Sequence, residues 1–287
     1  MRKRLRDKLS AALPSEELDK VYNSFDVIGD IAIIKINALQ NAEAIAKQIM
    51  ASQKNIKTVF TPATNITGDF RVRKLKHLAG EMKTVTCHKE SGCSFKVDVE
   101  KCYFSPRLSF EHSRIAKLVE FGEIVVNMFA GVGCFSIAIA KTAGQTKVYS
   151  IDVNPVAIQY IVENARINEV EETVFPMFGD AKDIINSRLQ GVADRVLMPL
   201  PEKALEYLPY ALSALKPTGG WIHYYDFQHA PGKENPAEKT KLKVAEKLDC
   251  LGLNYVFANS RVMRPTGPNW YQTVVDIKVE ALPNKFY

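Results

Sequence analysis

Residues 127–135, NMFAGVGCF, decide the fold of this chain. The residues around them predict a buried strand in EIVVNMF and a helix in CFSIAIAKTA. Gly131 and Gly133 lie between these two elements, where residues without side chains let backbone N–H groups and a helix N-terminus approach a ligand closely. A strand, a glycine loop and a helix in this order are typical of a nucleotide-binding α/β domain.

Strands and helices continue to alternate after the glycine loop. We expect strands in KVYSIDV, VFPMFGDA, ADRVLMPLP and WIHYYDF. We expect helices in NPVAIQYIVENARINEV, KALEYLPYALSALK and residues 235–251. NYVFANSRVM and WYQTVVDIKV resemble a closing antiparallel pair. The pattern predicts an α/β fold with a Rossmann-like, doubly wound and mostly parallel sheet that has an antiparallel C-terminal edge.

The residues before the glycine loop follow a different pattern. FDVIGDIAIIKI predicts two short strands that turn at Gly29-Asp30, residues 38–53 predict a helix, and TVFTPAT predicts a strand. KTVTCH and CSFKVDV predict a hairpin around the turn ESG. We therefore expect a basic helical leader over 1–21, a small, largely antiparallel α+β domain over 22–105, and the cofactor-binding domain over 106–287.

Composition and charge restrict the class of protein. The chain is 46% hydrophobic and 24% charged, which is typical of a globular protein, and its net charge of +6 is compatible with a polyanionic partner. Basic residues concentrate in MRKRLRDK at positions 1–8 and RVRKLK at positions 71–76, although solvated surface is an equal reading of either run. No run of about 18 apolar residues predicts a membrane span, and no apolar segment follows the basic start as in a secretory signal.

The five cysteines are typical of a chain kept reduced in the cytoplasm, where we expect this protein to act. Cys87 and Cys93 flank His88, but their spacing fits no common zinc pattern, and we expect no metal site. We expect these two cysteines to face each other across the Glu90-Ser91-Gly92 turn. They could then form a disulfide if the protein came from a hyperthermophile.

An acidic residue follows the second strand of the predicted sheet. Asp152 lies 19 positions beyond Gly133, where a carboxylate can accept both hydroxyls of a ribose. NAD enzymes and S-adenosylmethionine enzymes both use this arrangement, but Ser136 stands where an NAD site has its third glycine. Gly179-Asp180-Ala181 supplies an acid where methyltransferases place one against the adenine. S-adenosylmethionine is therefore the predicted cofactor, and a cofactor-free glycine turn is the alternative.

The fourth strand ends in Met198-Pro199-Leu200-Pro201. In amino-group methyltransferases this position often carries Asn/Asp-Pro-Pro-Tyr, whose rigid backbone lines the target base. The equal alternative is a proline-rich stop at the end of a strand.

Segments spread from residue 25 to about 227 resemble one family. They are FDVIGDIAIIKI, RVRKLKHLAGE, YFSPRLSFEHSRI, NMFAGVGCFSIAIAK, IDVNPVAI, GDA, MPLP and GGWIHYYDF. The chain resembles the archaeal and eukaryal tRNA (guanine-37-N1)-methyltransferases and their wyosine-pathway relatives, and YFSPRL together with MFAGVG is a specific combination. The resemblance implies transfer of a methyl group from S-adenosylmethionine to N1 of the guanine 3′ of the tRNA anticodon.

The resemblance also implies roles for individual residues. Glu111 is the general base, and Arg71 stabilises the guanine O6. The remaining catalytic positions, near the target base, are Tyr103, Pro199 and Pro201. The cofactor-binding positions are His112, Phe129, Gly131, Gly133, Asp152, Val153, Asp180 and Ala181. The tRNA-binding positions, in the small domain or at its end, are Arg71, Arg73 and Arg107.

The implied chemistry is sound. Guanine N1 carries a proton and becomes a good nucleophile only when that proton leaves, and a carboxylate whose pKa is raised by burial can take it. The negative charge then spreads to O6, where a guanidinium stabilises it. The base at position 37 must be splayed out of the anticodon loop to reach such a site.

Three departures from the family pattern keep other reactions open. Pro199 replaces a usual asparagine, His112 replaces a frequent arginine, and only 24 residues precede FDVIGD, where many archaeal members carry an additional domain. One alternative is aminocarboxypropyl transfer to a wyosine precursor at the same position, and another is methylation of carbon 7 of that precursor. A non-catalytic tRNA-binding protein is the alternative of another class. We expect a monomer.

Overall fold

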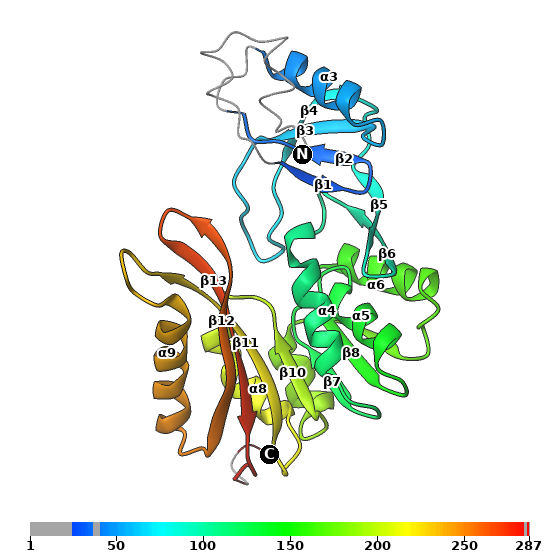
Figure 1. The fold of residues 1–287 in the computed structure, drawn as a ribbon. Helices are drawn as coiled ribbons and strands as arrows, with labels where there is room; N and C mark the ends of the chain where they lie inside the picture. The colour runs from blue at the N-terminus through cyan, green and yellow to red at the C-terminus, as the bar shows by residue number, and fades with distance from the viewer. Residues whose placement is uncertain (1–24, 37–40, 284–285, 287) are drawn as a thin grey trace. The chain divides into compact units, whose positions relative to one another are not determined.

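The structure is a computed structural model that describes residues 25–36, 41–283 and 286. The helical leader predicted over residues 1–21 lies outside this range. The chain divides into two compact units, Met1–Ser109 and Phe110–Tyr287, where the sequence predicted a boundary after residue 105. Figure 1 shows the elements of both units in chain order.

The first unit contains a four-stranded sheet in the order β1-β2-β3-β4. Its strands are β1 (Asp26–Ile28), β2 (Ile31–Ile33), β3 (Thr58–Pro62) and β4 (Leu75–Gly80). The pairs β1–β2 and β3–β4 are antiparallel, whereas β2 and β3 are parallel because helix α3 (Ala42–Ser52) connects them. The apolar face of α3 packs on this sheet through Ile45 and Ile49. The predicted turn at Gly29-Asp30 is confirmed.

The predicted hairpin is present as β5 (Val85–Glu90) and β6 (Cys93–Asp98), but its turn is shorter than expected. Glu90 pairs with Cys93, so the loop has two residues, Ser91 and Gly92, both with positive φ. Cys87 therefore pairs with Lys96 and is exposed, whereas Cys93 is buried. The prediction that the two cysteines face each other was wrong, because Cys87 lies opposite Lys96 and Cys93 lies opposite Glu90.

The second unit contains a seven-stranded sheet in the order β12-β13-β11-β10-β7-β8-β9. Its strands are β7 (Ile124–Asn127), β8 (Lys147–Asp152), β9 (Val174–Phe178), β10 (Arg195–Met198), β11 (Gly220–His229), β12 (Tyr255–Gly267) and β13 (Trp270–Val279). The five neighbouring strands β9, β8, β7, β10 and β11 are parallel, and β13 lies antiparallel between β11 and β12. This confirms the predicted doubly wound sheet with an antiparallel C-terminal edge.

Six α-helices belong to the described part of the second unit. They are α4 (Ser109–Leu118), α5 (Cys134–Thr142), α6 (Pro155–Ile167), α7 (Ala181–Ile184), α8 (Ala204–Ala214) and α9 (Pro236–Cys250). A π-helical turn, Ile185–Leu189, continues α7, and the sequence patterns did not predict either element. Adjacent residues of β11 point to opposite faces of the sheet. Tyr225 packs with α4 and α5 on one face, whereas Tyr224 packs with α8 and α9 on the other. Helices therefore cover both faces of the sheet.

The order of the strands reverses next to β7, because the chain runs from β7 to β9 on one side and returns to β10 on the other. Ligands of open α/β sheets bind at the carboxyl ends of the strands beside such a reversal. In the described part of the chain, no helix is long and apolar enough to span a membrane.

Candidate functional site

The glycine loop follows β7 directly and has a backbone that suits glycine. Gly131 has a φ of 56° and Gly133 a φ of 92°, both in the left-handed region. A Cβ on Gly133 would lie 3.3 Å from Ile137 Cδ1 and 3.4 Å from Ile161 Cγ1, which is closer than ordinary contact. Gly133 is also the residue from which α5 begins. The loop thus brings bare backbone and a helix N-terminus to the carboxyl edge of the sheet.

Asp152 at the end of β8 is bound to this loop. Its Oδ2 accepts a hydrogen bond of 2.7 Å from the Gly131 N–H, and its Oδ1 accepts one of 2.9 Å from the Asn154 N–H. Burial raises the pKa of Asp152, although these two hydrogen bonds oppose the shift. Each carboxylate oxygen keeps a second lone pair, so the pair of oxygens can still accept two ribose hydroxyls. Val153 follows it and is half-buried.

Ser136 explains why the third glycine of an NAD-type loop is missing. Its side chain is fully buried, and its Oγ accepts hydrogen bonds from Ser150 Oγ at 2.7 Å and from Asn127 Nδ2 at 3.2 Å. These bonds join α5 to β7 and β8. A serine therefore has a structural role here that a glycine could not perform.

Asp180 begins α7 beyond β9, and its Oδ1 accepts the Lys182 N–H at 3.0 Å. The hydroxyl of Tyr207 on α8 donates to the same carboxylate at 2.9–3.0 Å. The Tyr207 ring lies edge-on to Phe129 of the glycine loop, with the ring centroids 5.2 Å apart. Tyr207, which sequence reasoning missed, thus links two predicted cofactor positions. Ala181 is buried beside them.

A cavity of about 340 Å³ opens at this edge of the sheet. It is lined by residues of β9 and α7, among them Met177, Phe178, Gly179 and Asp180. Three of the predicted cofactor-binding groups (the glycine loop, Asp152 and Asp180) therefore lie at the carboxyl ends of successive strands, as a nucleoside site requires.

Glu111 on α4 is buried and held by three donors. Arg114 donates from Nη2 to Oε1 at 2.7 Å and from Nε to Oε2 at 2.9 Å. The Tyr225 hydroxyl donates to Oε1 at 2.8 Å, and Arg261 Nη2 bonds to Oε2. Burial alone would raise the pKa of Glu111, but the hydrogen bonds from Arg114 and the charges of Arg114 and Arg261 outweigh it and lower the pKa. The predicted rise in pKa was therefore wrong, because the burial brings two cations with it.

A buried chain of polar groups continues behind Glu111. Arg114 also binds Asp276 on β13, at 2.6 Å from Nη1 and 3.0 Å from Nη2. Asp276 Oδ1 lies 2.6 Å from His223 Nδ1, and His223 Nε2 lies 2.8 Å from Arg195 Nη1. Burial lowers the pKa of His223, so the neutral ring accepts from Arg195 and donates to Asp276.

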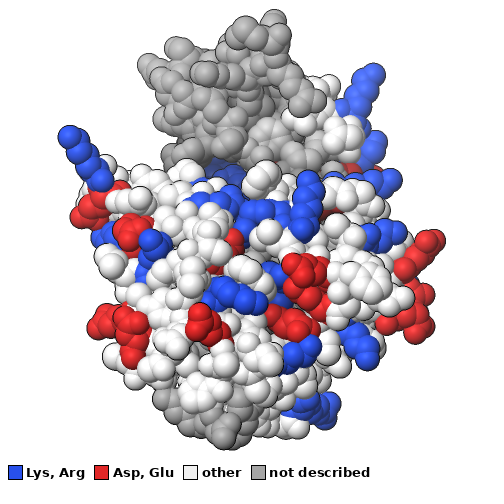
Figure 2. Space-filling view, turned by 60° about the horizontal axis from the view of Figure 1, so that its bottom comes forward, with Lys and Arg blue, Asp and Glu red and all other residues white. Residues whose placement is uncertain are grey.

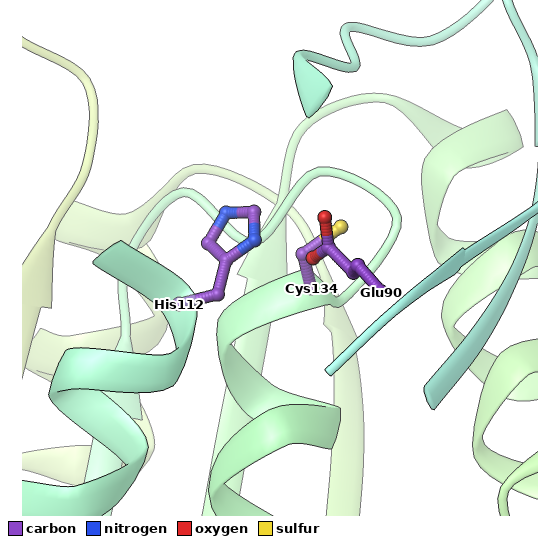
Figure 3. A group of neighbouring side chains, drawn as sticks. All are labelled: Glu90, His112 and Cys134. Atoms are coloured by element: carbon purple, nitrogen blue, oxygen red, sulfur yellow. The ribbon is translucent and has the colours of Figure 1, made fainter. Parts of the chain in front are cut away.

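His112 follows Glu111 on α4 and is buried. Its ring lies edge-on to Phe135, with the centroids 4.5 Å apart. Figure 3 shows His112 on α4 beside Cys134 at the start of α5. His112 therefore lies beside the start of α5, where the glycine loop ends, which suits its predicted position near the cofactor.

The first unit groups three of the predicted residues. Arg71 has a positive φ of 51°, and its guanidinium lies 4.5 Å from the centroid of the Tyr103 ring. Arg71, Arg73 and Tyr103 line one small cavity of this unit. Arg107 is different, because its Nε donates to Asp26 Oδ1 at 2.7 Å. An arginine in the left-handed region is strained, and such strain is common at functional positions.

The two prolines lie at the carboxyl end of β10, at the same edge as the glycine loop. Pro201 is buried and Pro199 is half-buried. Leu200 O accepts the Lys203 N–H at 3.1 Å and turns the chain into α8. The prolines therefore end β10 and make the backbone rigid beside the strand reversal.

Two known families match consecutive parts of the chain. Residues 86–251 match the TRM5/TYW2 methyltransferase domain, and residues 5–84 match the TYW2 N-terminal domain.

Three relatives show the range of activities named among similar proteins. The chain is 40% identical to the Pyrococcus abyssi "tRNA (guanine(37)-N(1))-methyltransferase Trm5b", over 93% of this chain and 78% of that protein. It is 34% identical to the Saccharolobus solfataricus "tRNA 4-demethylwyosine(37)-methyltransferase Taw21", over 92% and 96%. It is 35% identical to a Methanocaldococcus jannaschii "tRNA(Phe) (4-demethylwyosine(37)-C(7)) aminocarboxypropyltransferase", over 90% and 98%.

Solved structures that resemble this one include two in complex with a ligand. The complex of aTrm5 with tRNALeu has a TM-score of 0.83 and 33% identity, covering 98% of this chain and 79% of that one. M. jannaschii TYW2 in complex with AdoMet has a TM-score of 0.65 and 29% identity, covering 90% of this chain and 100% of that one.

Proposed function

This chain belongs to the TRM5/TYW2 methyltransferase family, and from that membership we propose that it transfers the methyl group of S-adenosylmethionine to N1 of guanosine 37 in tRNA. The observation that carries the proposal is the pairing of a nucleoside site at the strand reversal with an ionised, buried carboxylate, Glu111, in the same unit. The residues fit the cofactor, because Gly133 leaves its backbone bare and Asp152 keeps two lone pairs for a ribose.

Different residues of this chain contribute to different parts of the proposed reaction. When bound, the cofactor supplies a methyl group that is already activated on a sulfonium, so positioning does much of the catalysis. Glu111 accepts the N1 proton of guanine, and Arg71 stabilises the negative charge that develops on O6. The lowered pKa of Glu111 keeps it unprotonated at neutral pH, which is the state a base requires.

A tRNA partner is consistent with the charge of the chain, whose net value is +6. On the face drawn in Figure 2, Lys and Arg side chains are mixed with Asp and Glu side chains. A mixed surface favours binding at particular positions over uniform attraction to any polyanion. We therefore assign tRNA contact to individual residues, Arg71 and Arg73 first.

Asp152→Ala should weaken binding of S-adenosylmethionine by about 100-fold, because two charge-assisted hydrogen bonds to the ribose are lost. Isothermal titration calorimetry measures this affinity without tRNA. Glu246→Ala, which removes an exposed carboxylate of α9 away from this edge of the sheet, is the control and should bind nearly as the wild type does. Equal affinities for all three proteins would remove Asp152 from the cofactor site.

Arg71→Gly should separate function from stability. Glycine relieves the positive φ of Arg71 but loses the contact with Tyr103, so the free energy of unfolding should stay within about 1 kcal/mol of the wild type. The methyl-transfer rate should fall by about 10²–10³-fold, because a group stabilising the O6 charge is lost. Thermal denaturation and single-turnover kinetics measure the two effects. A stable variant with the wild-type rate would exclude the role.

The type of group transferred tests the proposal directly. The protein is incubated with an unmodified G37 tRNA transcript and with S-adenosylmethionine labelled either in the methyl group or in the carboxyl group. We expect label in the tRNA only from the methyl-labelled donor. Incorporation from the carboxyl-labelled donor would show aminocarboxypropyl transfer, and no incorporation from either donor would favour a binding protein.

A wyosine-pathway reaction is the second candidate. Residues 5–84 match the TYW2 N-terminal domain, and Pro199 stands where the N1-methyltransferases commonly have asparagine. The same labelled donors, offered with tRNA that carries 4-demethylwyosine at position 37, test both of its forms. Methyl label would indicate carbon-7 methylation, and carboxyl label would indicate aminocarboxypropyl transfer.

A further inference from the structure

Arg261 on β12 is the most accessible of the three residues that bind Glu111. Its side chain is 27% exposed, compared with 16% for Arg114, and Tyr225 is fully buried. Arg114 is also fixed at its other end by Asp276. The Nε of Arg261 is buried without a hydrogen-bond partner among the described residues. Arg261 is therefore the donor that can leave with the least loss of other contacts.

The hydrogen bonds to Glu111 fill its acceptor positions. Oε1 accepts from Arg114 Nη2 and the Tyr225 hydroxyl, while Oε2 accepts from Arg114 Nε and Arg261 Nη2. A carboxylate offers about four lone-pair positions, so all of them are taken. No proton can be delivered to Glu111 from outside until one donor moves away. Glu111 therefore has the negative charge that a base requires, but its oxygens are not accessible to a substrate proton.

An exposed aromatic ring lies beside the ion pair. Phe110 precedes Glu111 on α4 and is 71% exposed, and the Arg261 guanidinium lies 5.3 Å from its ring centroid. Single exposed aromatic rings of this kind are the usual stacking surfaces for unpaired bases. A purine that replaced the guanidinium over Phe110 would be next to the Glu111 carboxylate.

We propose that Arg261 blocks the Glu111 carboxylate in the absence of RNA. The target guanine displaces Arg261, so that Glu111 becomes an accessible base only in the complex. This inference rests on the proposed function, and it makes Arg261 a positioning residue that acts through Glu111. The charge of Arg261 is one of the influences that lower the pKa of Glu111. Its departure should raise that pKa, while Arg114, Tyr225 and, behind Arg114, Asp276 keep their places.

The pH dependence of the reaction provides the test. The acid limb of kcat/KM reports the free protein, and the acid limb of kcat reports the complex. In the wild type the acid limb of kcat should therefore lie at higher pH than that of kcat/KM. In Arg261→Met the limb of kcat/KM should move up by about 1 pH unit and close this gap, because a nearby opposite charge is lost.

Two further variants separate this role from a structural one. Arg264→Met removes a cation from the same strand, one that bonds Gln272 instead of Glu111, and should keep the wild-type gap. Arg261→Lys keeps a cation and should keep most of the gap, whereas Arg261→Gln keeps a polar side chain without the charge and should lose the gap, which preserves the test if Arg261→Met folds poorly. Coincident acid limbs in the wild type, or an unchanged gap in Arg261→Met, would overturn the inference.

A binding measurement covers the case in which the wild type transfers no methyl group and the proposed function fails. The Arg261 Nε signal is assigned in the NMR spectrum by its loss in Arg261→Met. It is then followed as G37 tRNA and S-adenosylhomocysteine are added to the wild type. Displacement predicts a shifted or broadened Arg261 signal on saturation with tRNA. A signal that stays at its free position in the saturated complex refutes the displacement, whatever the reaction is.

Discussion

Glu111→Gln is expected to lower the rate of methyl transfer by about 10²–10⁴-fold at saturating substrates, because the side chain can no longer accept the N1 proton. Glutamine is nearly isosteric and its amide oxygen can still accept from Arg114 and Tyr225, but its amide N–H groups face Arg114 Nε and Arg261, so some loss of stability is expected and thermal denaturation checks that the variant is folded. The glycine loop and Asp152 do not bond to Glu111, and the affinity for S-adenosylmethionine should therefore stay within a factor of about three.

Single-turnover kinetics and calorimetry on the same preparations measure these two effects. Glu120→Gln, which removes an exposed carboxylate just beyond α4, is the matched control and should keep the wild-type rate. A Glu111→Gln protein that is folded, binds the cofactor and turns over normally would remove Glu111 as the base. A parallel loss of cofactor affinity would show that the residue shapes the binding site instead.

Asp276→Asn should lower the free energy of unfolding by about 3–5 kcal/mol at pH 7, because it leaves the buried Arg114 with less compensating charge. Asp276 is 3% exposed and accepts hydrogen bonds from Arg114, His223 and Asn259. Burial would raise its pKa, but the bonds from His223 and Arg114 outweigh burial and hold the pKa of Asp276 below its usual range.

The sign of the pH dependence follows from that lowered pKa. The stabilisation by Asp276 is fully present above the pKa of an unfolded aspartate, near 4, and is lost as the pH falls below it. The difference between wild type and Asp276→Asn should therefore be constant from about pH 5 to pH 8 and shrink in more acidic buffers. Urea denaturation at several pH values measures it, with the exposed Asp249→Asn as control. A difference below about 1 kcal/mol at pH 7 would contradict the structural role of this buried chain.

Local patterns were enough to place the predicted cofactor-binding residues at one edge of the sheet. The glycine loop and Asp180 follow their strands by a few residues and Asp152 is the last residue of its strand, so strand periodicity places all three at one edge of the sheet. The alternating residues of β12 and β13 likewise predicted this antiparallel pair at the edge of the sheet. The hairpin register was not, because the sequence ESG does not say whether two or three of its residues form the loop.

The surroundings of Glu111 could not be predicted in the same way. Arg261 and Asp276 lie 150 and 165 positions beyond Glu111 in the sequence, and only the folded sheet brings β12, β13 and α4 together. Without these partners, burial alone suggested a raised pKa, whereas the structure lowers it. One signal was available, because Tyr225 and His223 lie within the motif GGWIHYYDF, which carried part of the family resemblance. The same motif carried no indication of which side chains they contact.

The identity of the modified nucleoside tests the central claim most directly. Two transcripts of one tRNA, with guanosine or adenosine at position 37, are incubated with the protein and S-adenosylmethionine, digested to nucleosides and analysed by liquid chromatography and mass spectrometry. N1 methylation at position 37 predicts 1-methylguanosine from the G37 transcript and no methylated nucleoside from the A37 transcript. Absence of 1-methylguanosine from the G37 digest, with a folded protein that binds the cofactor, would contradict it.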